Sequence, residues 1–391
     1  MTCKRLASQL ALVIATLLPL YYLRFHIGGL PTNLIEVLVV LQLVLTVVGY
    51  RRLSLPNFWP ILLIVLGVVL ASFFALDQRV AFGIVKGWFV VPLIYYACLN
   101  TVFPPDQRHV FIRPLLISLV LVSLYAIGQY FGLIPLLNHQ LPEAEQYLTQ
   151  GRAIGFFESP NFLAMYLVPL TLLAGGYIIL MKKFRACWWL ILPLTVIVLS
   201  QSQAGLLALG FGIVWLWLWQ SSRQNTPSRS QLTGWAIGAL AVLLVMWRWV
   251  DDPARLLIWK NTWVMIREQP IFGIGPGQFQ TIFSSLSDQS SQYVAVAPYA
   301  LHPHNLFLNL YLSAGLAGFT GLVWLLVTLG RDFFRETFRS PLALVASAAI
   351  VAVLVHGLFD STYFKNDLAI IFWLLVFLVS NGYKESNAHR A

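Results

Sequence analysis

Residues 304–329 read HNLFLNLYLSAGLAGFTGLVWLLVTL, and this stretch decides the fold class of the chain. It contains no Asp, Glu, Lys or Arg and exceeds the roughly 20 residues that a helix needs to cross a bilayer. Its apolar residues show no period of two, which argues against a strand of an outer-membrane barrel. A face of small residues lets another helix approach closely, and it consists of Ala314, Gly315, Ala317, Gly318 and Gly321. The stretch therefore predicts a membrane-spanning helix that packs tightly on a neighbour.

The composition extends this prediction to the whole chain of 391 residues, of which 59% are hydrophobic and only 10% charged. A soluble domain carries about 25% charged residues, so we expect an all-α polytopic membrane protein that forms one integral membrane domain over residues 1–391. About twelve transmembrane helices are expected, with a helical extracytoplasmic loop before the tenth. The candidate spans lie at roughly residues 6–24, 33–50, 57–75, 81–100, 111–131, 160–181, 186–200, 203–220, 233–249, 304–329, 341–359 and 367–382.

The net charge of +10 is explained by membrane topology. With both termini in the cytoplasm, the connections between spans place about twice as many Lys and Arg residues inside as outside, which agrees with the positive-inside rule. No nucleic-acid partner is therefore expected. The cysteines, Cys3, Cys98 and Cys187, are scattered and predict neither a disulfide framework nor a metal site.

Two connections on the predicted outer face are long, at about residues 132–159 and 250–303. Neither is long enough to form an enzyme domain, so any chemistry must be shared between loops and span ends. A shorter connection, SQSQ at residues 200–203, lies in an apolar region with a basic cluster at each end. Two crossings keep both clusters inside, which predicts a tight external hairpin between the seventh and eighth spans.

The longer loop opens with DDPARLLIWKNTWVMIREQP at residues 251–270, which carries helix signals. Asp252 is a suitable N-cap, Pro253 suits the first helical position, and Pro270 ends the segment. An apolar face with two indoles predicts a helix lying in the outer interface of the membrane, and it consists of Leu256, Trp259, Trp263 and Ile266. Arg255 falls in the first turn, where the helix dipole also favours an anion. The spacing equally allows Arg255 to snorkel to lipid phosphates.

The loop continues with IFGIGPGQF at residues 271–279. This glycine run follows no strand and precedes no clear helix, so it does not indicate a nucleotide-binding fingerprint. A tight turn that redirects the chain is expected instead.

The loop ends with His302, Pro303, His304 and Asn305, directly before the tenth span. Pro303 disfavours helix at His302, so the helix should start at His304 or Asn305, and Asn305 is a suitable cap. The helix dipole and neighbouring arginines disfavour a charged imidazole at His304, which keeps it in the neutral form that a general base requires. Polar residues at span ends are common, however, and the residues alone favour a simple cap at the headgroup level.

The shorter loop ends with RAIGFFESPNFLAMYL at residues 152–167. Arg152 is the only basic residue of its loop and forms at most a weak ion pair with Glu158. Pro160 and Asn161 begin the sixth span, as in an ordinary entry from a loop into a helix.

Other ionisable groups are weaker candidates. In the last external turn, His356 and Asp360 follow the spacing of one helical turn, but one His and one Asp are too few ligands to predict a metal. Glu36 and Lys86 fall within spans, where ionisable groups are functional candidates by default, although Lys86 can snorkel outward.

The order of these motifs resembles the O-antigen ligase and polymerase family of bacterial envelopes. RAIGFFESPN, a hairpin tip before AGLLAL, ARLLIWKNTWVMIREQPIFGIGPGQF and HPHNLFLNLYLSAGLAG follow in the family's order from about residue 152 onward. Members of that family are multi-span glycosyltransferases that take a glycan from an undecaprenyl-pyrophosphate carrier and pass it to an acceptor hydroxyl. The resemblance implies an enzyme of the cytoplasmic membrane whose active site faces the periplasm or exterior.

The resemblance also assigns residues. The family's loop arginine matches Arg255, its His-Asn pair matches His304 and Asn305, and the motifs of the earlier loop match Arg152, Pro160 and Asn161. Where the family usually has Ser-Arg-Gly at the hairpin tip, this chain has Ser202-Gln203-Ala204. Gln203 can donate a hydrogen bond but carries no charge, so either Arg152 or Lys86 substitutes for the arginine or the chain acts on a different lipid. The implied catalytic residues are His304 and Arg255, and the implied substrate-binding residues are Arg152, Asn161, Gln203, Asn305, His302 and Lys86.

The implied reaction is an inverting transfer that uses neither metal nor cofactor. Arg255, helped by Arg152, would stabilise the departing pyrophosphate, and His304 would take the proton of the acceptor hydroxyl. The partners are the carrier-linked donor, a lipid or glycan acceptor, and membrane lipids. A ligase and a polymerase differ only in the acceptor, and the single large loop before the tenth span favours a ligase by analogy.

Two alternatives remain open. A transporter would use Glu36 and Lys86 along a solute pathway. A non-catalytic relative would bind the carrier lipid only, and the missing arginine at the hairpin tip makes this alternative credible.

Overall fold

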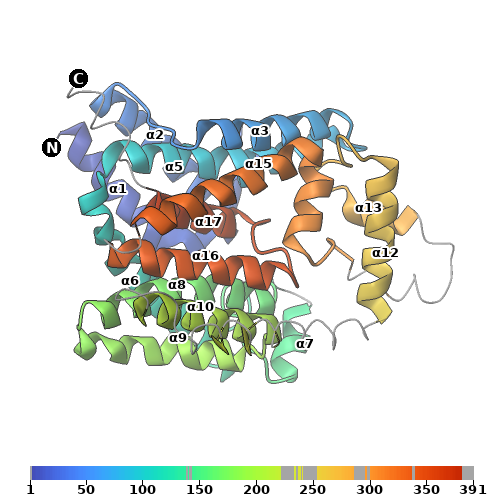
Figure 1. The fold of residues 1–391 in the computed structure, drawn as a ribbon. Coiled ribbons are helices and arrows are strands. Elements are labelled where there is room, and N and C mark those ends of the chain that lie inside the picture. The colour runs from blue at the N-terminus through green and yellow to red at the C-terminus, as the bar shows by residue number, and fades with distance from the viewer. Residues whose placement is uncertain are drawn as a thin grey trace.

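The computed structural model describes residues 2–137, 140, 143–221, 233, 234, 237, 238, 240, 253–285, 296, 300–336 and 340–380. In this part of the chain the regular structure is almost entirely helical, and the long helices lie side by side in one bundle (Figure 1). The α-helices are α1 (Cys3–Leu17), α2 (Leu34–Tyr50), α3 (Phe58–Phe73), α4 (Gln78–Ile84), α5 (Val91–Val102), α6 (Ile112–Tyr130), α7 (Glu143–Thr149), α8 (Pro160–Leu180), α9 (Trp188–Leu199), α10 (Gln203–Ser221), α12 (Pro253–Glu268), α13 (Phe279–Ser285), α15 (Leu306–Glu336), α16 (Pro341–Gly357) and α17 (Asn366–Val379). Short 3-10 or π-helical turns are η1 (Leu18–Tyr22), η2 (Val85–Val90), η3 (Pro105–Phe111) and η5 (Phe184–Cys187).

The chain is a multi-pass membrane protein. Among the described residues, 6 helices are long and apolar enough to cross a membrane, and shorter apolar helices accompany them. Each of these helices coincides with a span predicted from the sequence. The ninth predicted span, at roughly residues 233–249, lies almost wholly outside the described residues, so the expected total of about twelve spans stays a prediction.

One short antiparallel hairpin, β1 (Arg24–Ile27) with β2 (Leu30–Asn33), is not predicted by the sequence pattern. It turns at Gly28 and Gly29, whose φ angles of 57° and 81° favour glycine. The hairpin also shortens the first predicted span, because α1 ends at Leu17 and η1 at Tyr22. A strand of 4 residues is too short for its alternation to be told from a loop by sequence.

The predicted small-residue face of the tenth span packs on α3. A Cβ atom added at Gly67 of α3 would lie 2.4 Å from the carbonyl oxygen of Ala314, and one at Gly321 would lie 2.7 Å from that of Pro60. The two backbones are therefore in direct contact, and the expected close approach is confirmed.

The tenth span is broken at Gly315, where φ is 61° and ψ is −164°. The glycine run after α12 fills the break. The amides of Ile274 and Gly275 donate to the carbonyl oxygen of Leu312 at 2.8 and 3.1 Å, and the amide of Leu316 donates to that of Ile271 at 2.9 Å. A Cβ atom at Gly273 would lie 2.4 Å from Leu312 O, so the approach requires glycine. The run is thus a turn, as predicted, and it fastens the long loop to α15.

The two ends of the bundle differ. The start of α1 and the end of α17 lie at one end, on the left in Figure 1. Asn57, before α3, donates to Ser380, after α17, at 3.4 Å. At the opposite end, α12 lies crosswise over the ends of the long helices (Figure 1). Leu256 and Trp263 of α12 remain exposed, as an interfacial helix requires, whereas Ile266 packs inside with Ile258 and Met265.

Candidate active site

A polar cavity of about 280 Å³ lies at the α12 end of the bundle. It is lined by Arg152, Asn161, Gln201, Gln203, Ala204, Arg255, Phe359 and Asp360. These residues come from the loop before α8 and the first turn of α8, the turn before α10 and the first turn of α10, the first turn of α12, and the turn between α16 and α17. Predicted site residues from distant parts of the sequence therefore meet around one space.

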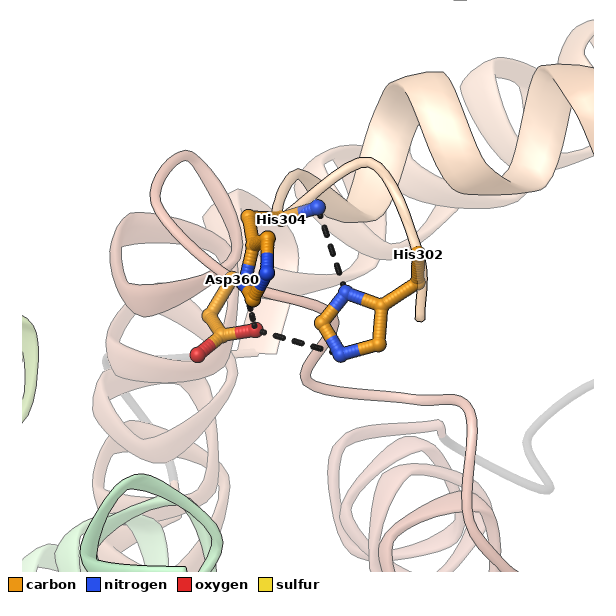
Figure 2. Close-up of side chains that lie close together, drawn as sticks. All are labelled: His302, His304 and Asp360. Atoms are coloured by element: carbon orange, nitrogen blue, oxygen red, sulfur yellow. Dashed lines mark hydrogen bonds and ion pairs between the residues drawn. The ribbon is translucent and has the colours of Figure 1, made fainter. Parts of the chain in front are cut away.

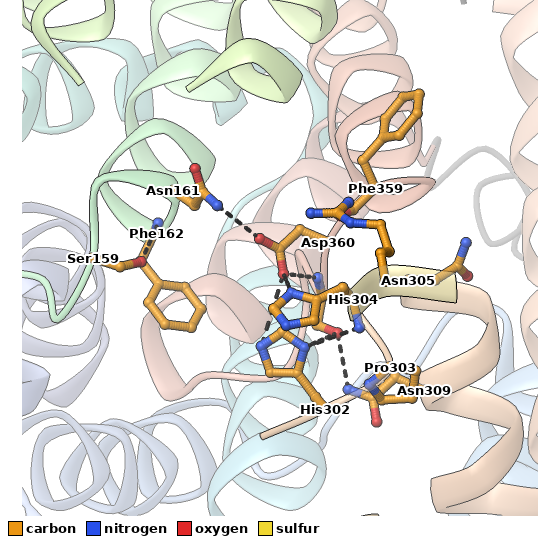
Figure 3. Close-up of polar contacts among 12 residues, drawn as sticks. Ser159, Asn161, Phe162, His302, Pro303, His304, Asn305, Asn309, Phe359 and Asp360 are labelled. Carbon is orange, nitrogen blue, oxygen red and sulfur yellow. Dashed lines mark hydrogen bonds and ion pairs between the residues drawn. The ribbon is translucent and has the colours of Figure 1, made fainter. Parts of the chain in front are cut away.

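Asp360 is the residue that joins these segments (Figure 3). Its Oδ1 lies 3.3 Å from Nδ1 of His304. Its Oδ2 accepts a hydrogen bond of 3.2 Å from the side-chain nitrogen Nδ2 of Asn161. Burial by itself raises the pKa of the Asp360 carboxyl, but the hydrogen bond with His304 and the charge interactions with His304, His302 and His356 together outweigh burial and hold that pKa well below its usual range. Asp360 is therefore a carboxylate at neutral pH.

The backbone of His304 brings the two histidines of the HPH motif together (Figure 2). His304 has a φ of 48°, in the left-handed region that few non-glycine residues adopt. In this conformation its amide donates to Nδ1 of His302 at 3.2 Å, and the ring centroids of the two imidazoles are 4.3 Å apart. Strained backbone of this kind is typical of functional sites.

His302 is held neutral. Burial, with repulsion from His304 and partial compensation by Asp360, lowers the pKa of His302 to about 3. Because Nδ1 of His302 accepts the amide hydrogen of His304, the hydrogen of the neutral ring must sit on Nε2. That nitrogen lies 3.8 Å from Oδ1 of Asp360.

The same hydrogen-bond pattern bears on metal binding. His302, His304 and Asp360 offer ligand atoms that all lie within 4.8 Å of one another, the spacing of a candidate metal site among the described residues. A metal-binding imidazole needs a lone pair on the nitrogen facing the ion. The hydrogen on Nε2 of His302 occupies that position, so these residues fit a hydrogen-bonded cluster better than a metal centre.

Asn305 uses its whole side chain for structure. Its Oδ1 accepts hydrogen bonds from the amides of Phe307 and Leu308 at 2.9 and 3.0 Å, which confirms the predicted cap of α15. Its amide nitrogen donates to the carbonyl oxygen of Leu358 at 2.9 Å. Asn305 thus fixes the start of α15 against the end of α16 and places His304 beside Asp360.

The two arginines enter the cavity from different sides. Arg255 donates from Nη1 to the carbonyl oxygen of Phe359 at 2.9 Å, next to Asp360. Arg152 donates from Nε to the carbonyl oxygen of Ser200 at 3.1 Å, in the hairpin tip that also carries Gln203. These bonds set the position of each guanidinium at the cavity, which both side chains line.

Lys86 is placed elsewhere. Its ammonium lies 2.8 Å from Oε2 of Glu36 and donates to the carbonyl oxygen of Pro31 at 2.5 Å, beside the β1–β2 hairpin. Lys86 is not among the residues that line the cavity. The expectation that it substitutes for the missing tip arginine is therefore not supported by its position, because its charge is already paired.

Sequence reasoning missed the role of Asp360. It considered this residue only as a metal ligand with His356, whereas the side chain of Asp360 contacts His304 and Asn161 instead. The available signal was an acidic residue directly after the eleventh predicted span, on the same predicted side of the membrane as His304. Only the fold brings the two within contact.

These observations define a class: a multi-pass helical membrane protein with a polar site, rich in arginine and histidine, at one end of its bundle. Residues 188–323 match the family model described as O-antigen ligase, Wzy_C, a family shared by O-antigen ligases and polymerases. The matched region runs from α9 to within α15 and includes Gln203, Arg255 and His304. No curated protein matches the chain.

Proposed function

We propose that the protein transfers a glycan from undecaprenyl-pyrophosphate to an acceptor hydroxyl, in the manner of an O-antigen ligase, by an inverting and metal-independent reaction. The observation that carries this proposal is the common cavity: Arg255 and Arg152 line it, and His304 contacts the Asp360 that also lines it. The site then provides an anion-binding part and a base-bearing part within reach of one substrate.

The arginines bind the leaving group, which is the pyrophosphate. As the bond between sugar and pyrophosphate breaks, negative charge grows on the phosphate oxygen. Guanidinium groups bind such oxygens with paired, charge-assisted hydrogen bonds. Gln203, where an arginine is usual, adds a neutral donor, so Arg152 and Arg255 carry the positive charge of the cavity.

His304 serves as the general base for the acceptor hydroxyl. The Asp360 carboxylate accepts the hydrogen of Nδ1, which leaves the lone pair of His304 on Nε2. That lone pair takes the hydroxyl proton as the oxygen attacks the anomeric carbon from the side opposite to the pyrophosphate. Asp360 also stabilises the imidazolium that results, as the carboxylate of a catalytic triad does.

The site is proposed to face the periplasm or exterior, with both termini in the cytoplasm. The predicted topology places the excess of Lys and Arg on the opposite side of the membrane, which supports this orientation. The start of α1 and the end of α17 lie at the end of the bundle away from α12 (Figure 1). The acceptor is a lipid or a glycan, and a polymerase of the same family would use the same residues with a carrier-linked acceptor.

A reconstituted assay tests this function. Purified protein is incubated with a defined carrier-linked glycan and with either a lipid acceptor or a second carrier-linked glycan, with and without a chelator. We expect transfer that persists with the chelator and inverts the anomeric configuration. Absence of transfer to every acceptor, or loss of transfer with the chelator, would contradict the proposal.

A further inference from the structure

An ion pair between the buried Lys365 and the partly exposed Glu158 lies beside the cavity and has no part in the proposed chemistry. The ammonium of Lys365 bonds to Oε2 of Glu158 and to the hydroxyl of Tyr21, and that hydroxyl donates to the same Glu158 oxygen at 2.9 Å. The side chain of Lys365 is only 10% exposed. Aromatic rings enclose the ammonium, with centroids at 4.4, 5.4 and 4.3 Å for Tyr21, Phe157 and Phe162.

The pair joins the two segments that hold Asp360 in place. Glu158 precedes Asn161 in the loop that enters α8, and Lys365 follows Asp360 in the turn that leads into α17. The same two segments meet again where Asn161 donates to Oδ2 of Asp360. They are therefore fastened at two points, one the ion pair, the other a single hydrogen bond at the cavity.

We propose that the Lys365–Glu158 pair is a positioning device, which holds Asn161 against Oδ2 of Asp360 so that Oδ1 stays directed at His304. This inference rests on the proposed function for its catalytic meaning. Neither Lys365 nor Glu158 lines the cavity, so both act through Asp360. A shift of about 1 Å at such a carboxylate is large for catalysis, because proton transfer requires a close and aligned contact.

A purely stabilising role makes a different prediction. Removal of one partner leaves an uncompensated buried charge and destabilises the fold, whereas removal of both partners relieves that cost. Stability should then recover in the double variant Glu158→Gln with Lys365→Met. If the pair only stabilises the protein, catalysis recovers with stability; if it positions Asp360, catalysis does not.

The experiment compares three variants, Lys365→Met, Glu158→Gln and the double variant, with a control that removes a second Lys–Glu pair, Lys86→Met with Glu36→Gln. Thermal melting gives stability, and the kcat and KM for the carrier-linked donor are measured per amount of folded protein. We expect the double variant to melt above both single variants and to keep a kcat about tenfold below the wild type, with the KM for the donor within about twofold. The control should keep its kcat. A double variant with wild-type kcat, or one in which only the KM changes, overturns the proposal.

A second readout does not depend on turnover. In protein labelled with 15N-histidine, the Nδ1 resonance of His304, assigned by its loss in His304→Ala, reports the hydrogen bond to Asp360. We expect it to move toward that of a free imidazole in the double variant and to stay in the control. An unchanged resonance overturns the positioning role. A shifted resonance in a protein that transfers no glycan supports positioning and contradicts the proposed function, so the two failures are distinguishable.

Discussion

Two polar clusters of the molecule differ in how their charges are used. The hairpin cluster, Glu36, Lys86 and Asn366, is closed: Oε2 of Glu36 is 2.8 Å from Lys86, and its Oε1 accepts from Asn366 at 3.1 Å. In the cavity cluster, Arg152, Arg255 and Asp360 border about 280 Å³ of polar space, and His304 contacts Asp360. Both contain groups that the sequence marks as candidates. The comparison teaches that an ionisable group near the membrane is a better functional candidate when it borders a polar cavity than when it pairs with a neighbouring side chain.

The largest expected effect is at His304. Replacement by alanine removes the proposed base, and we expect transfer to fall on the order of 10³-fold with the amount of folded protein unchanged. The measurement is initial transfer rate in reconstituted membranes, normalised to folded protein. Full activity of this variant would remove the main distinction between the two clusters.

Asp360→Asn should have the next largest effect. The amide of asparagine can donate to Nδ1 of His304, which would favour the hydrogen on Nε2 and so block the lone pair that takes the proton. We expect kcat to fall on the order of 10²-fold with little change in the KM for the donor. A loss seen only in KM would instead place Asp360 in substrate binding.

Arg255→Lys tests the anion-binding part. Lysine keeps the charge but cannot reproduce the paired donors of the guanidinium, so we expect a loss of about tenfold, smaller than for complete removal of a donor. The matched control is Lys260→Arg, which changes an exposed residue one turn further along α12. Equal activity of Arg255→Lys and the wild type would show that position 255 supplies only a charge.

The smallest effect is expected in the hairpin cluster. Lys86 is 42% exposed, and an ion pair at such a position contributes little, so Lys86→Met with Glu36→Gln should change transfer by less than about twofold. The same assay applies. A large loss of transfer would show that the hairpin cluster takes part in the reaction. A loss of solute flux with intact transfer would favour the transporter alternative.

The fold class followed from the sequence because long apolar runs leave the backbone no option but to satisfy its own hydrogen bonds within helices. The glycine run after α12 and the cap at Asn305 were also predictable, since both depend on the conformational limits of single residues. The β1–β2 hairpin was not, because its strands are too short to carry a periodic signal.

The sequence by itself determined the membrane class and the placement of most helices, and its family resemblance named Arg152, Arg255 and His304 as candidates. Only the tertiary structure decided which charges meet. It paired Lys86 with Glu36 away from the cavity, and it brought Asp360 to His304 across 56 residues. The physical reason is that hydrophobicity and backbone preference are local properties, whereas the partner of a charge depends on how separate helices pack.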